Sequence, residues 1–121
     1  MQVGSFSKSD ANGNSKVINK KYSHDSDLFD IFRYDKTVLT YDDYDKTGLF
    51  RSVIFKGEEL VCFSPPKAMQ FDMFSEKYPT ISESITFEEF VEGTMINLYW
   101  DDEFNKWEIC TKSSIGANIK F

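Results

Sequence analysis

The fold is decided by residues 49–63, which read LFRSVIFKGEELVCF. Two runs rich in β-branched and aromatic residues, 49–55 and 60–63, flank the short connection Lys56-Gly57-Glu58-Glu59. A glycine-containing connection of this length between two such runs is typical of a β-hairpin. The stretch therefore predicts two antiparallel strands, and it places a charge, Arg51, within the first of them.

A second hairpin is predicted near the end of the chain. Residues 94–100 alternate between Met95, Asn97 and Tyr99 on one side and Ile96, Leu98 and Trp100 on the other. This period of two indicates a strand with two different faces. A polar turn at 101–106 and a further strand at 107–112 complete the hairpin, and residues 85–92 are predicted to form a strand that ends at Gly93.

The remaining segments add short elements around the two hairpins. Residues 27–32 are expected to begin the folded region as a short helix, and residues 38–41 are expected to form a strand before the acidic loop 42–48. Proline offers no donor to a sheet, so Ser64-Pro65-Pro66 ends a strand and residues 67–77 continue as a helix or helical turn. Many short strands with one or two helices predict an α+β fold built on antiparallel sheet.

The chain of 121 residues is long enough for one domain. Residues 1–26 are rich in Ser, Asn, Asp, Lys and Gly, which predicts a flexible polar leader before a domain at 27–121. Within residues 1–21, four lysines stand against one aspartate. This surplus fits either a solvated tail or an arm that touches phosphates.

Composition excludes several classes of protein. A net charge of -6 argues against a protein that coats nucleic acid through a general positive field, although it allows a few focused cations. Cys62 and Cys110 lie in apolar runs and are expected to be free thiols of a reduced, intracellular protein in the cytoplasm. With His24 as the single histidine, no metal site and no nucleophile triad is predicted. No segment is apolar enough to predict a membrane span.

Three cations on rigid elements are candidate ligands for a polyphosphate: Arg51, Lys67 after two prolines, and Lys112 at the end of the last strand. Each also has an ordinary interpretation, as a solvated, loop or edge-strand charge. Glu92 and Gly93 add a carboxylate beside a glycine, which lets a ligand approach the backbone closely.

The order of these residues resembles the nucleotidyltransferase domain of phage-type RNA ligases, the ATP-dependent RNA ligase 1 group that repairs broken tRNA. The resemblance covers roughly the last 70 residues. It rests on four stretches, which are Phe50-Arg51-Ser52-Val53-Ile54-Phe55, Ser64-Pro65-Pro66-Lys67-Ala68-Met69, Phe90-Val91-Glu92-Gly93-Thr94 and Thr111-Lys112-Ser113-Ser114-Ile115-Gly116.

The resemblance implies a nucleotide site and a source in a phage or large DNA virus. Arg51 and Lys67 would contact the phosphates of ATP, Gly93 would shape the nucleotide pocket, and Lys112 would lie beside the nucleotide. Glu92 is the fifth residue expected to bind the nucleotide. ATP and Mg²⁺ are the cofactors that the family implies, with RNA ends or a complementing ligase segment as partners. If the protein is viral, it would act in the cytoplasm of the host.

Phe90 stands where the family has the lysine that attacks the α-phosphate of ATP. Phenylalanine has no nucleophilic lone pair, so this residue cannot form a lysyl-adenylate. The chain also stops at Phe121, before the later carboxylate and lysine motifs of the family. We therefore expect a domain related to RNA repair that is not an active ligase by itself.

Several alternatives remain open from the sequence. The chain can be a degenerate or split ligase, or a binding module that keeps the pocket. It can also be a non-enzymatic structural or interaction protein that reuses the fold, for example a viral assembly component with a protein partner. A further alternative is that Lys67, partly desolvated beside Arg51, replaces the missing nucleophile.

Overall fold

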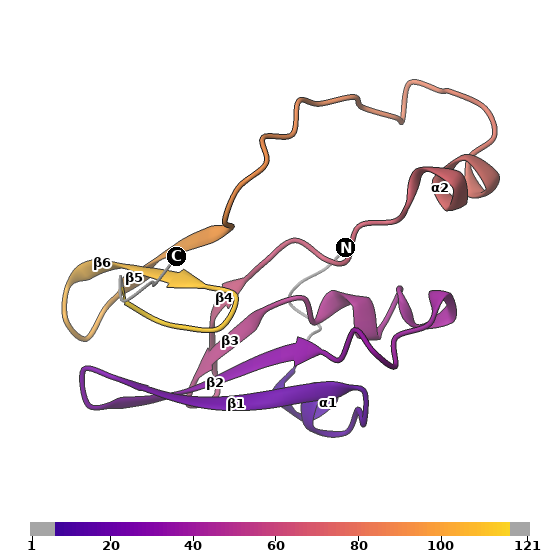
Figure 1. Cartoon of the computed structure of the whole chain (residues 1–121). Coiled ribbons are helices and arrows are strands. Elements are labelled where there is room, and N and C mark those ends of the chain that lie inside the picture. Colours follow the sequence, from indigo (N-terminus) through magenta and orange to yellow (C-terminus); the bar gives the residue numbers. More distant parts are fainter. Residues whose placement is uncertain (1–6, 117–121) are drawn as a thin grey trace.

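A computed structural model describes residues 7–116 of the chain and has α+β architecture (Figure 1). Its main element is a four-stranded antiparallel sheet in sequence order, made of β1 (Val17–His24), β2 (Asp27–Tyr34), β3 (Val53–Lys56) and β4 (Glu59–Phe63). A separate antiparallel hairpin consists of β5 (Ile96–Asp101) and β6 (Lys106–Thr111). The helical elements are α1 (Lys8–Asn12), α2 (Phe71–Lys77) and two single 3-10 turns, η2 (Tyr41–Asp43) and η3 (Thr47–Leu49).

The strand β2 is the centre of the main sheet. Its residues Phe29 to Phe32 are all buried, because the sheet is covered on both faces at this point. A strand buried on both faces reads as a continuous apolar run rather than as an alternation, so periodicity cannot separate it from a buried helix. For this reason the short helix expected at 27–32 was the wrong element.

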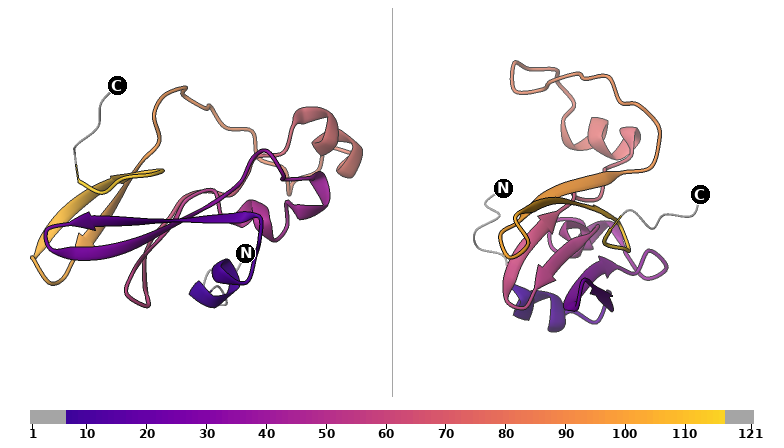
Figure 2. Two further views of the ribbon diagram at one scale, coloured as in Figure 1. Left: turned by 60° about the horizontal axis from the view of Figure 1, so that its bottom comes forward. Right: turned by 90° about the vertical axis from the view of Figure 1, so that its left-hand side faces the viewer.

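One face of the main sheet packs against the β5–β6 hairpin, which lies across it (Figure 2). The buried residues between the two sheets come from both of them: Phe29, Ile31, Ile54, Cys62, Tyr99, Cys110 and Ile115. The thiols of Cys62 and Cys110 lie 3.1 Å apart in this layer, and both are free. The hairpin is therefore held on the sheet by a small apolar core.

The opposite face of the main sheet carries a second apolar cluster: Ala11, Phe32, Phe50, Val53 and Phe55, with Leu60 and Phe63 packed against it. A β-bulge lies opposite Ile54 and Phe55, since Cys62 pairs with Ile54 while Leu60 pairs with Phe55. This extra residue turns Leu60 toward the second cluster and Cys62 toward the first. Both faces of β4 thus contribute to packing.

A buried carboxylate attaches α1 to the second face. The side chain of Asp30 is 5% exposed, and Lys8 of α1 lies 2.5 Å from it. Lys21 also donates to this carboxylate, and Asn19 donates to it at 3.0 Å. A buried charge of this kind is stable only when its acceptor positions are filled.

The N-terminal prediction needs correction. Of the expected flexible leader 1–26, residues 1–6 lie outside the described residues, but residues 7–26 form α1, all of β1 and the first turn. Ser7 and Asp10 make a capping box at the start of α1. Polar composition was misleading because β1 is an edge strand whose side chains are mostly exposed, and pairing with β2 stabilises it.

Two other predicted strands are absent from the structure. Residues 38–41 are a turn that leads into η2, and residues 85–92 are extended without a partner strand. The two hairpins themselves are correct, although β3 begins at Val53 and β5 at Ile96, so Arg51 and Gly93 precede the strands instead of lying within or ending one.

Residues 64–95 form an arm that leaves the main body, carries α2 and returns to β5 (Figures 1 and 2). Several of its large apolar side chains are exposed: Phe71, Tyr78, Ile81, Phe87, Phe90 and Val91. Among the residues that the structure describes, no helix has the length and apolar character needed to cross a membrane.

Candidate anion-binding site

Three of the five residues predicted to bind nucleotide line one cavity of about 310 Å³: Arg51, Gly93 and Lys112. The antiparallel topology explains this convergence. Arg51 precedes β3 and Gly93 precedes β5, while Lys112 follows β6, and the start of one strand lies beside the end of its hairpin partner. The cavity therefore lies at one end of both sheets.

The remaining lining is rich in hydroxyl groups, from Ser52, Ser64, Thr94, Thr111 and Ser113. Two of these hydroxyls, on Ser52 and Ser64, join the segments next to β3 and β4 to the β5–β6 hairpin, and a third closes the turn after β6. Ser52 Oγ donates to the carbonyl of Lys112 at 3.1 Å, Asn97 donates to Ser64 Oγ at 2.7 Å, and Thr111 Oγ1 lies 2.8 Å from Ser114 Oγ. The wall of the cavity is thus fixed by hydrogen bonds between elements distant in sequence.

Further cations surround Lys112. A neighbouring cavity of about 260 Å³ shares Lys112 and is lined by Arg33 and Lys36 together with the carboxylate of Asp35. On the rim, Lys20 of β1 donates to the carbonyl of Ser113 at 2.8 Å. The positive charges that line these two cavities come from β2, the turn after β2, the segment before β3, and the end of β6.

The pKa of Lys112 is lowered by burial and by these neighbouring cations. Loss of hydration lowers the pKa of Lys112, and the positive charges of Arg33, Arg51 and Lys36 lower it further. Among the described residues, no carboxylate lies within ion-pair distance of Lys112 or Arg51. An anion placed in the cavity would relieve this repulsion.

Arg33 also has a hydrogen-bond donor that could bind an anion. Its Nε atom is buried and has no hydrogen-bond partner among the described residues. A buried donor without a partner is costly, so the group favours an acceptor that enters from outside. The charge of Arg33 interacts favourably with Asp35, whose carboxylate also accepts hydrogen bonds from the backbone N–H and the hydroxyl of Thr37.

Gly93 contributes open space rather than a special backbone conformation. No atom beyond its chain neighbours lies within 4 Å of the position that a Cβ would take, and its φ is not in the left-handed region. A side chain here would be accommodated by the fold and would occupy room beside the cavity. The space beside the backbone of Gly93 is therefore open.

Lys67 and Glu92 do not line this cavity. The Lys67 ammonium lies over the ring of Tyr44, 5.5 Å from its centroid, and its backbone N–H donates to the carbonyl of Gly48 at 2.9 Å. Glu92 and Phe90 are exposed on the arm, Phe90 by 82%. Both residues therefore lie on an exposed part of the chain, away from the cavity.

A larger cavity of about 610 Å³ lies between the turn after α1 and η3. It is lined by Asp10 and Lys46, whose charges are opposite, and by none of the predicted site residues. The smaller cavity is the better candidate site because its charged groups all have one sign.

Arg33 and Lys36 were missed by sequence reasoning. Their contribution depends on β2 being a strand beside β3, with Phe32 opposite Val53. Beyond this pair the backbone N–H of Tyr34 donates to the carbonyl of Phe50 at 2.6 Å, so the end of β2 lies beside the segment before β3. Because residues 27–32 were expected to be helical, the pairing of β2 with β3 could not be predicted. An Arg in the run DLFDIFRYDK was the signal that could have been used.

Comparison with known proteins found no matching family model, no similar curated protein and no similar solved structure.

Proposed function

We propose that the chain is an RNA-ligase-like nucleotidyltransferase domain that binds the phosphates of ATP or of an RNA end without forming a covalent adenylate. The observation that supports this proposal most directly is the shared cavity of Arg51, Gly93 and Lys112. These residues belong to three of the four stretches that carry the resemblance to RNA ligases, and they are far apart in the sequence.

The chemistry of the cavity favours a phosphate group. A guanidinium matches two phosphate oxygens with parallel hydrogen bonds, and an ammonium adds a compact charge. The hydroxyls and backbone of Thr94 and Ser113 line the same space and supply neutral donors. A volume of about 310 Å³ is at the lower end of the range for small-molecule sites, so it fits a polyphosphate group better than a whole nucleotide.

The fit to the two implied cofactors differs. The residues around the cavity suit the phosphates of ATP, but none of the described residues that line it is acidic. Mg²⁺ is held in proteins mainly by carboxylates together with substrate phosphates. We therefore expect binding of ATP that does not require Mg²⁺.

Covalent catalysis is not part of the proposal. Phe90 has no nucleophilic atom and lies exposed on the arm. Lys67, the alternative nucleophile, is turned toward Tyr44 and does not line the cavity. Neither residue is placed to attack the α-phosphate of a nucleotide bound between Arg51 and Lys112.

The first experiment combines two measurements on the full chain. Incubation with ATP labelled on the α-phosphate, followed by denaturing electrophoresis, is expected to leave the protein unlabelled. Isothermal titration with unlabelled ATP, with and without Mg²⁺, is expected to show weak binding in both cases. A labelled protein would show that a covalent step occurs, and no heat at millimolar ATP would remove the nucleotide-binding proposal.

Variants connect the binding to the cavity. Arg51→Gln and Lys112→Gln each remove one charged hydrogen-bond donor, worth about 1.5 kcal/mol, so ATP should bind roughly tenfold more weakly. Gly93→Val fills open space and should weaken binding without changing stability. Lys77→Gln removes an exposed charge from α2 and is the matched control, for which binding should be unchanged.

RNA ends can be tested in the same format. A short RNA with a 5′-phosphate should bind more tightly than the same RNA with a 5′-hydroxyl, and Lys112→Gln should reduce this difference. Equal binding of both RNAs would mean that the cavity does not recognise a terminal phosphate.

A second candidate function is supported by the arm. Its apolar side chains Phe71, Ile81, Phe87, Phe90 and Val91 are each exposed, and large apolar side chains of this kind are often buried against a partner. This favours a non-enzymatic interaction protein, or a ligase segment completed by another polypeptide. Co-expression followed by co-purification tests it: a stable complex that is lost when Phe87 and Phe90 are replaced by Ser supports this function, and a monomer without partners opposes it.

A further inference from the structure

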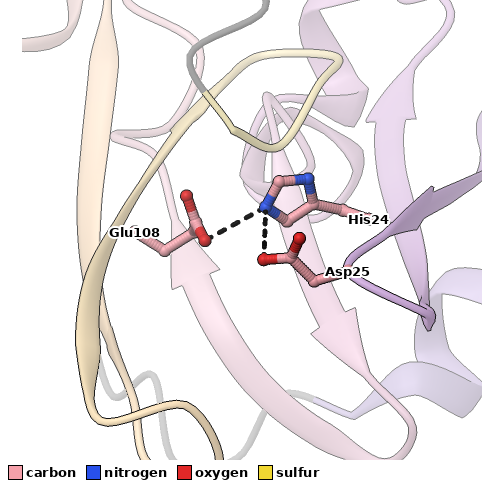
Figure 3. A group of neighbouring side chains, drawn as sticks. All are labelled: His24, Asp25 and Glu108. Atoms are coloured by element: carbon pink, nitrogen blue, oxygen red, sulfur yellow. Dashed lines mark hydrogen bonds and ion pairs between the residues drawn. The ribbon is translucent and has the colours of Figure 1, made fainter.

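The turn between β1 and β2 meets β6 in a second cluster of polar side chains, at the other end of the hairpin from the anion site (Figure 3). His24 Nε2 lies 3.0 Å from Glu108 Oε2 and 3.3 Å from Asp25 Oδ2. All three atoms lie within 4.8 Å of one another. We propose that His24, Asp25 and Glu108 form a zinc-binding site.

The distances suit zinc coordination. Zinc bonds of about 2.0–2.2 Å at tetrahedral angles place neighbouring ligand atoms about 3.3–3.6 Å apart. The two separations from His24 Nε2 are close to this range. One imidazole and two carboxylates are a donor set that zinc accepts, and three protein ligands leave the fourth position for water or a substrate.

The local backbone fixes two of the ligands. Asp25 and Ser26 both have positive φ, 50° and 66°, which is the conformation of a tight turn between antiparallel strands. Gly116 has a φ of 81°, and a Cβ at this residue would come 2.6 Å from His24 Cε1. The imidazole therefore lies in a space that exists because residue 116 is glycine.

The ammonium group of Lys106 forms ion pairs with the carboxylates of both Asp25 and Glu108. Lys106 Nζ lies 2.7 Å from Asp25 Oδ2 and 3.1 Å from Glu108 Oε2. The Lys106 side chain is 44% exposed, so it can turn into solvent when a metal ion takes its place. The same oxygens would thus exchange an ammonium for a divalent cation.

Because Lys106 competes with the metal ion, replacing a ligand should lower the zinc affinity and replacing Lys106 should raise it. The full chain is freed of metal by dialysis against a chelator and titrated with Zn²⁺ against a chromophoric zinc chelator, with Co²⁺ as a spectroscopic probe of the ligand geometry. We expect one Zn²⁺ per chain. His24→Gln and Glu108→Gln should each weaken binding at least about tenfold, whereas Lys106→Gln should strengthen it because the competing ammonium is gone.

Two controls exclude other ligands. Glu103 lies in the turn of the same β5–β6 hairpin as Glu108, and its carboxylate pairs with Lys56 of β3. Glu103→Gln removes this carboxylate, and zinc affinity should be unchanged. Cys62→Ala removes one of the buried thiols that face each other, and one Zn²⁺ should still bind. Circular dichroism of each variant checks that it is folded.

The results distinguish a zinc site from a network of ion pairs. Loss of binding in His24→Gln together with a gain in Lys106→Gln establishes the site. No Zn²⁺ binding in both the unmodified chain and Lys106→Gln, or binding that survives His24→Gln, would show that the cluster is only an ion-pair network joining the β1–β2 turn to β6.

Discussion

Replacement of Asp30 by Asn tests whether one buried carboxylate attaches α1 and β1 to the main sheet. Lys8, Lys21 and Asn19 all donate to Asp30, whose side chain is 5% exposed. Burial alone would raise the pKa of Asp30, but these donors outweigh it and lower the pKa from 3.8 to about 2. The charged form is therefore favoured by folding.

The magnitude follows from the pKa. Each tenfold change in proton affinity corresponds to about 1.4 kcal/mol, so the lowering to about 2 corresponds to roughly 2 kcal/mol of stability when Asp30 is ionised. Because the folded pKa lies below the ordinary value, this contribution is present above about pH 4. It is lost as the pH falls from 4 toward 2.

Urea unfolding followed by far-ultraviolet circular dichroism measures this contribution. At pH 7, Asp30→Asn should lower the free energy of unfolding by about 2 kcal/mol, and the difference from the unmodified chain should shrink as the pH approaches 2. The exposed Asp42 supplies the control substitution Asp42→Asn, which should have little effect. A loss below about 0.5 kcal/mol at pH 7, or a loss that does not depend on pH, would refute the reasoning.

The other predictions concern the core and the two sites. Ile31→Ala should destabilise the chain by about 3 kcal/mol in urea unfolding, whereas Ile81→Ala on the exposed arm should change stability by less than about 0.5 kcal/mol. Gly116→Ala should cost about 1 kcal/mol or more, because it combines an unfavourable φ with a clash against His24, and it should also weaken Zn²⁺ binding in the chelator titration. Phe90→Lys should not create labelling by ATP, because residue 90 lies on the exposed arm; a labelled Phe90→Lys protein would contradict the structure of this segment. Lys112→Gln should leave Zn²⁺ affinity unchanged, and an effect above about threefold would show that the two sites are linked.

The parts of the fold that the sequence predicted are those specified by neighbouring residues. Both hairpins carry strong local signals, the glycine connection after Lys56 and the alternation from Met95 to Trp100. The pairing of β1 with β2 carries no such signal, since β1 is mostly polar and the centre of β2 is buried on both faces, so neither strand shows a simple alternation. Only their pairing with each other and with β3 gives these segments their structure, and that depends on contacts between distant parts of the chain.

The same distinction applies to the sites. Arg51, Gly93 and Lys112 could be proposed from the sequence because they are cations and a glycine at predicted strands, in an order that resembles the RNA ligases. Arg33 could not, since it reaches the anion site only through the register of β2 with β3. His24 and Glu108 are 84 residues apart, and no local pattern relates the turn after β1 to the second hairpin.

The strand β6 explains why the two candidate sites lie where they do. Alternation along a strand puts Lys106, Glu108 and Cys110 on one face, with Lys112 next in the same series. Only Cys110, in the middle, joins the apolar layer between the sheets. The polar residues on either side of it meet the ends of the main sheet, where Glu108 finds His24 and the backbone of Lys112 meets Ser52. A hairpin with a short apolar centre and charged ends therefore stabilises the packing of the sheets at its middle. At its ends it leaves one cluster that contains carboxylates and one that contains cations, which are the two sites proposed above for ligands of opposite charge.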